Sequence, residues 1–81
     1  MRFYVGRRYK VVEGAGLDSR REGVMLPPQT YSQSWIRKNE PGRYYRFDPY
    51  REVLLLDDNG NVFTMFKSYL NEVKNAHSKE Y

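Results

Sequence analysis

The sequence predicts an all-β domain, a small five-stranded antiparallel barrel with a long aromatic connection and a short polar C-terminal tail. Its apolar segments are short and end at glycine, proline or Asn-Gly turns, as strands do. None of them repeats with the helical period. With 81 residues, the chain is long enough for one domain. We expect the barrel over 1–74 and a flexible tail over 75–81.

The first part of the chain contains two predicted strands. Residues 8–13 place Tyr9 and Val11 on one face of an extended segment, and the glycines of 14–16 end it. The apolar run 23–26 is stopped by two prolines, which cannot donate to a central ladder.

The clearest prediction is a hairpin in the second half. Residues 51–57 form a bounded apolar run, and 62–66 are rich in β-formers. Asn59-Gly60 lies between them, a pair favoured in tight turns whose central residues both need positive φ. We expect a single helical turn over 67–69 and a short closing strand over 70–73.

The connection over 29–50 has no clean period and mixes aromatic with basic side chains. Such a long connection tends to carry function or to contain a short element of its own. Pro41-Gly42 marks a turn in it, and 44–47 could form an irregular strand. Two interpretations are open: the connection is a lid over the barrel, or it is a binding surface.

The predicted core draws on every strand. Val53 and Leu55 share one face of their strand, and Leu54 and Leu56 share the other. Because both faces are apolar, this strand is either central or covered on one face by the aromatic connection. The predicted core residues are Tyr9, Val11, Val24, Leu26, Val53, Leu55, Val62, Phe63, Met65, Phe66 and Leu70.

Composition argues against several function classes. The sequence has no cysteine and a single histidine, His77, so it offers no zinc ligand set. A nucleophile needs a nearby base, and the only imidazole lies in the predicted tail. We therefore expect no enzyme activity, no cofactor, no metal and no small-molecule substrate. No apolar run is long enough to span a membrane, and we expect a cytoplasmic monomer.

The order of predicted elements resembles that of Src-homology-3-like small barrels. Residues 9–25 also resemble the KOW motif of ribosomal proteins and transcription elongation factors, with Gly14 and Gly23 at the two glycine positions and Val24 or Met25 as the following apolar residue. The loop carries Asp18 and Glu22 where that family usually has glycine and lysine. The resemblance implies a small barrel that binds nucleic acid.

The charge distribution indicates a surface that faces a polyanion. Residues 1–51 carry eleven Lys/Arg against five Asp/Glu, whereas 52–81 carry three against five. Arginines there can contact phosphates, and the extended Tyr44-Tyr45 pair should expose one ring for stacking on a base. The candidate binding residues are Arg20, Arg21, Trp35, Arg37, Lys38, Arg43, Tyr44, Tyr45 and Arg46.

Two functions fit these residues. The first is a non-catalytic, nucleic-acid-associated binding module that contacts RNA or DNA phosphates. The alternative is a protein-protein interaction module, an accessory or inhibitory subunit docking on a larger complex, because Tyr, Trp and Arg also dominate protein hot spots. Salt separates the two, since phosphate binding weakens steeply as salt rises.

Overall fold

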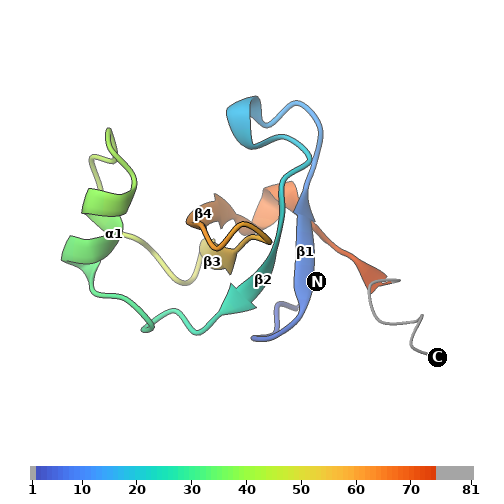
Figure 1. The fold of residues 1–81 in the computed structure, drawn as a ribbon, viewed down its shortest axis with the longest axis horizontal. Coiled ribbons are helices and arrows are strands. Elements are labelled where there is room, and N and C mark those ends of the chain that lie inside the picture. Colours follow the sequence, from blue (N-terminus) through green and yellow to red (C-terminus); the bar gives the residue numbers. More distant parts are fainter. Residues whose placement is uncertain (1, 75–81) are drawn as a thin grey trace.

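The computed structural model describes residues 2–74 and contains one five-stranded antiparallel sheet (Figure 1). The strands are β1 Arg8–Val11, β2 Glu22–Leu26, β3 Glu52–Leu56, β4 Val62–Phe66 and β5 Leu70–Glu72. A single α-helix, α1 Gln33–Asn39, and two 3-10 turns, Gly16–Asp18 and Lys67–Tyr69, complete the elements of that part of the chain. The predicted antiparallel β architecture is confirmed, and the predicted tail over 75–81 lies outside the described residues.

The sheet does not close into a barrel, and that part of the fold prediction is wrong. The strand order is β4-β3-β2-β1-β5, which leaves β4 and β5 as the two edges. Strand β5 is three residues long and pairs with β1. Figure 1 places it on the opposite side of the sheet from α1.

The outer edge of β4 is occupied by side chains of the connection. Asn39, the last residue of α1, donates from its side-chain amide to the Val62 carbonyl oxygen at 2.7 Å. The Glu40 carboxylate accepts the Thr64 backbone N–H at 3.0 Å. These backbone groups are therefore satisfied without a further strand, which removes one reason for the sheet to close.

Strand β3 is buried on both faces, as its apolar run predicts. On one face Val53 and Leu55 join a core cluster with Tyr9, Phe63 and Met65. On the other face Leu54 packs with two residues of the connection. Those two are Ile36 of α1 and Phe47. The connection therefore covers the second face of the sheet, one of the two arrangements expected from the sequence.

Four predicted core residues, Val24, Leu26, Val62 and Phe66, are only half-buried. The connection supplies Ile36 and Phe47 to the core instead, with exposed fractions of 2% and 3%.

The helix α1 is the kind of short element that the length of the connection allowed for, but the sequence did not predict it as a helix. Ser32 caps it by accepting the Trp35 backbone N–H at 3.1 Å, which satisfies one of the free donors of the first turn. It ends just before Pro41, which cannot continue a helix, and Gly42. Residues 44–47 form no strand.

The β3–β4 hairpin is present, but its turn differs from the expected type. Asp57 N–H donates to the Asn61 carbonyl at 2.9 Å, and Gly60 N–H donates to the Asp57 carbonyl at 3.1 Å, so three residues form the loop. Gly60 has φ +84°, whereas Asn59 does not have positive φ. This is the three-residue hairpin in which only the last loop residue is left-handed.

Candidate functional site

The structure separates the predicted binding residues into two groups. Arg20 and Arg21 lie on the loop between β1 and β2, whereas the other seven lie on α1 and the connection after it. Figure 1 shows these two regions at different places on the molecule. They do not form one continuous patch.

Arg21 is engaged in holding the β1–β2 loop to the β3–β4 hairpin. Its guanidinium pairs with Asp57 at 2.8 Å and with Asp18 at 2.9 Å, and it lies 3.8 Å from the Phe63 ring centroid. The hydrogen bond from Arg21, with the Asn61 and Asn59 backbone N–H groups, lowers the pKa of Asp57. These contacts leave Arg21 a structural role rather than a phosphate contact.

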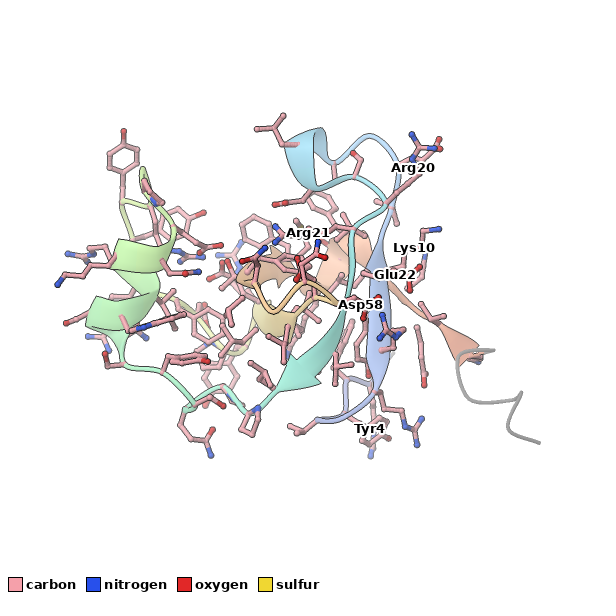
Figure 2. The ribbon with its side chains drawn as sticks, in the orientation of Figure 1. Tyr4, Lys10, Arg20, Arg21, Glu22 and Asp58 are labelled. Atoms are coloured by element: carbon pink, nitrogen blue, oxygen red, sulfur yellow. The ribbon has the colours of Figure 1, made fainter. Side chains whose placement is uncertain are left out.

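Arg20 points away from Arg21 and toward solvent (Figure 2). Its pair with Glu13 is long, at 3.6 Å, with the two side chains 70% and 76% exposed, and such pairs contribute little. Arg20 and Lys10 line one surface hollow of about 300 Å³. Glu13 lines the same hollow, so the positive charge of these two side chains is partly offset there.

Arg43 is the most buried of the predicted basic residues. Its side chain is 7% exposed and pairs with Glu52, which is 4% exposed. It also donates to Glu40 at 2.9 Å and to the Thr64 hydroxyl at 2.8 Å. Burial lowers the pKa of Arg43, but its hydrogen bonds to Glu52 and Glu40 outweigh that effect and raise it. Arg43 therefore anchors the connection to β3 and β4 and has no free donors to offer a phosphate.

Tyr44 and Tyr45 are both exposed, at 91% and 56%, whereas we expected only one of them to be. The alternation of faces applies to strands, and this segment is not a strand. Tyr45 is also held in place by Arg43. The Arg43 guanidinium lies 5.1 Å from the Tyr45 ring centroid and donates to the Tyr45 carbonyl oxygen at 3.3 Å.

Arg46 is brought to α1 by a glutamine that the sequence analysis missed. The Gln33 side chain donates to the Phe47 carbonyl oxygen at 2.9 Å and accepts the Phe47 N–H at 2.8 Å. This pair of bonds holds the following segment against the helix. Arg46 therefore joins Arg37 and Lys38, 9 and 8 positions earlier in the chain, around one hollow.

This hollow, which we call the basic hollow, has a volume of about 360 Å³ and is lined by Gln33, Ser34, Arg37, Lys38 and Arg46. Its lining contains no carboxylate. Within residues 2–74, Arg37, Lys38 and Arg46 make no ion pair. Three exposed cations without a paired carboxylate make this hollow locally positive.

Trp35 lies on the same helix, and its ring already stacks on another aromatic side chain. Its ring stacks on Tyr31 with centroids 3.8 Å apart, and it is 37% exposed. One face of the indole is therefore covered by Tyr31.

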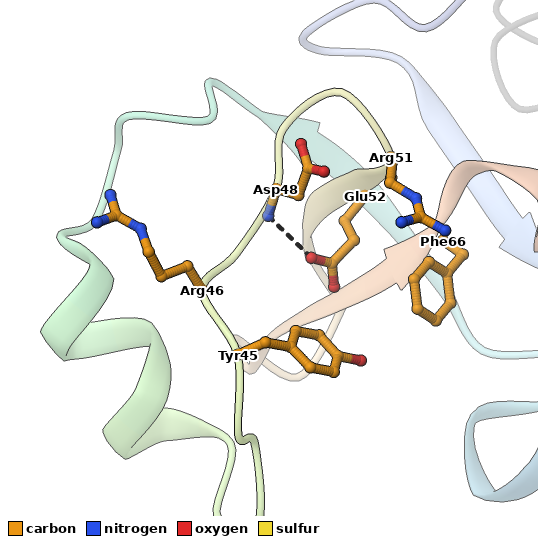
Figure 3. A pocket seen from close by; sticks show the side chains of 6 residues that line it. All are labelled: Tyr45, Arg46, Asp48, Arg51, Glu52 and Phe66. Carbon is orange, nitrogen blue, oxygen red and sulfur yellow. Dashed lines mark hydrogen bonds between the residues drawn. The ribbon is translucent and has the colours of Figure 1, made fainter.

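A second hollow, which we call the mixed hollow, shares Arg46 with the first. Figure 3 shows the residues that line it. It has a volume of about 350 Å³. Its lining combines two aromatic rings, two arginines and two carboxylates, namely Tyr45, Phe66, Arg46, Arg51, Asp48 and Glu52. Arg51 and Phe66 are not among the binding residues predicted from the sequence, because Arg51 precedes β3 and Phe66 ends β4, and the two meet only in the fold.

In the described part of the chain, no group of three metal-ligating side chains is present. There, too, no helix is long and apolar enough to cross a bilayer.

No protein-family model, no curated protein and no solved structure matches this chain. The likeness of residues 9–25 to the KOW motif therefore stays a resemblance of local sequence.

Proposed function

We propose that this protein is a non-catalytic module that binds single-stranded nucleic acid, with the basic hollow of Arg37, Lys38 and Arg46 contacting backbone phosphates. It acts without a cofactor and as a monomer. The observation that carries this proposal is the gathering of three exposed cations, from α1 and the connection, around a hollow whose lining has no acid.

The contacts of the other predicted arginines limit which residues we propose as phosphate contacts. Arg21 and Arg43 are satisfied by carboxylates, so they are not proposed as phosphate contacts. Arg20, with Lys10, supplies a secondary contact at most, because the two lie apart from the basic hollow. Binding through phosphates carries no sequence information, so we expect little sequence preference.

Fluorescence anisotropy with a short labelled oligothymidine strand tests this proposal. In the first variant, Arg37, Lys38 and Arg46 are all replaced by Ala. A charge-matched control replaces Lys10, Arg20 and Lys74 by Ala, so both proteins lose three positive charges. Each phosphate contact adds about 0.7 to the slope of log K against log salt for single strands. The first variant should lose about 2 from this slope, and the control should lose less.

Two results would contradict the proposal. The first is no binding at about 50 mM salt and 100 µM protein, where electrostatic binders are normally detectable. The second is equal weakening in the two variants, which would show that net charge rather than the basic hollow attracts the strand.

One observation favours the protein-docking alternative. Leu17, in the 3-10 turn of the β1–β2 loop, is fully exposed at 106%, and an isolated leucine at a loop tip suits an apolar pocket on a partner. A partner captured from a nuclease-treated lysate and lost on Leu17→Ser substitution would support docking. Capture that nuclease abolishes would support nucleic-acid binding.

A further inference from the structure

We propose that the mixed hollow beside the basic hollow receives one nucleobase of the bound strand, stacked on Tyr45. This inference rests on the proposed function and deepens it. The basic hollow would hold the phosphates, and the mixed hollow would hold the base attached to one of them. Figure 3 shows the residues concerned.

The charge of the mixed hollow suits a neutral group. Arg46 and Arg51 line it, but so do Asp48 and Glu52. A phosphate placed there would meet the Asp48 carboxylate, whereas a base carries no charge and offers both donors and acceptors. Arg43 pairs with Glu52 and also with Glu40, so these three side chains keep a net negative charge that disfavours a phosphate there as well.

Tyr45 is held as a stacking platform. The buried Arg43 guanidinium lies near its ring and also binds its carbonyl oxygen, so both the ring and the backbone of Tyr45 are tied to the sheet. The residue is still 56% exposed. A ring with restrained motion loses less entropy when a base stacks on it. Arg43 is thus a positioning residue for Tyr45.

The opposite side of the mixed hollow is also built from rigid parts. Phe66 ends β4, and its ring makes an edge contact with Tyr69 at 5.9 Å between centroids. Figure 3 shows the Arg51 guanidinium beside the Phe66 ring, and the Tyr45 ring directed toward the same side. A base on Tyr45 would therefore meet guanidinium donors and an aromatic edge.

Arg46 links the two hollows. It follows Tyr45 directly, and Figure 3 shows the two side chains pointing in opposite directions, Tyr45 toward Phe66 and Arg46 away from it. Arg46 lines both hollows. A nucleotide also presents its base and its phosphate on opposite sides of the sugar, so one nucleotide fits across this pair of residues.

The test compares Tyr45→Leu with Tyr44→Leu, a neighbouring tyrosine that is 91% exposed and lies outside the mixed hollow. Both are measured against a labelled oligothymidine strand and against an abasic strand of the same length. Tyr45→Leu should weaken oligothymidine binding by roughly five- to a hundredfold, the usual effect of losing one stacked base. It should leave abasic binding and the salt slope unchanged. Tyr44→Leu should leave both strands bound as in the native protein, and Tyr45→Phe should bind as the native protein does.

A second measurement uses the native protein, so it does not depend on how a variant folds. A strand containing 5-iodouracil is irradiated in the complex, and the cross-linked residue is identified by mass spectrometry. Cross-linking to Tyr45 or Phe66 is expected.

Three results would overturn the base site: equal effects of the two leucine variants, equal weakening of the abasic strand, or cross-links confined to Tyr44 or Trp35. Salt-dependent binding of the abasic strand would leave the proposed function standing in each case. If neither strand binds, both proposals fail.

Discussion

Replacing Arg43 by Met should destabilise the protein more than the same replacement of any other arginine in the connection. The substitution removes the guanidinium but leaves the Glu52 carboxylate, 4% exposed, without its counter-charge. Breaking a buried pair from one side typically costs about 3–5 kcal/mol. A domain of this size has a total stability of roughly 4–12 kcal/mol, so the loss removes a large fraction of it.

Urea unfolding measures this loss, followed by far-UV circular dichroism for the sheet and by fluorescence of Trp35 for the connection. We expect the midpoint to fall by roughly 2 M. Trp35 is the sole tryptophan and lies on α1, so its signal reports the segment that Arg43 anchors. Arg46→Met, three positions later and exposed, is the control and should stay within about 0.5 kcal/mol of the native protein.

The double variant Arg43→Met with Glu52→Met separates a lost attraction from an orphaned charge. If the unpaired carboxylate causes the damage, the double variant is more stable than Arg43→Met alone. The reasoning is refuted if Arg43→Met costs less than about 1 kcal/mol, or if removing Glu52 as well brings no recovery.

Three further predictions concern stability. Asp57→Asn should cost more stability at pH 7 than at pH 3, measured by thermal melts. The Arg21 contact lowers the pKa of Asp57 in the folded state, so the charged carboxylate stabilises the protein above the unfolded-state pKa, and this stabilisation is lost as the pH falls through the folded-state pKa. An equal cost at both pH values would argue against the Arg21 contact. Arg20→Gly should raise stability by about 0.5–1 kcal/mol, since Arg20 has φ +66°, a region in which glycine has no steric penalty, and a lower melting temperature would contradict this. Gly23→Ala should cost about 1–3 kcal/mol and lower the melting temperature by at least about 4 °C, because an added Cβ would lie 2.9 Å from the Leu56 carbonyl oxygen of β3; an unchanged melting temperature would mean that the strands separate easily there.

The hairpin and the double-faced burial of β3 could be predicted because their signals are local. A run of apolar residues bounded by turn residues identifies a strand whichever way it packs. The helix α1 could not be found by periodicity, because a helix of seven residues with one buried side chain, Ile36, has no repeat to detect. Its signals were instead at its ends: a serine that caps the first turn, and Pro41-Gly42 after the last.

The sequence predicted which segment carries the candidate site, but not which of its residues line the hollows. Arg37, Lys38 and Arg43 look alike in a basic stretch of sequence. What distinguishes Arg43 is a glutamate on β3, nine positions away, and that contact exists only after the connection has folded onto the sheet. Arg51 and Phe66, which line the mixed hollow, gave no local signal for the same reason.

The contacts of Asn39 and Glu40 with β4 bear on whether another chain can pair with this edge of the sheet. An uncovered edge strand invites another chain to pair with it, and here side chains at the end of α1 use the groups that such a chain would need. The segment that carries the proposed binding surface therefore also covers this edge of β4. Substitutions that loosen the segment should expose the backbone groups of β4 to pairing with a second molecule.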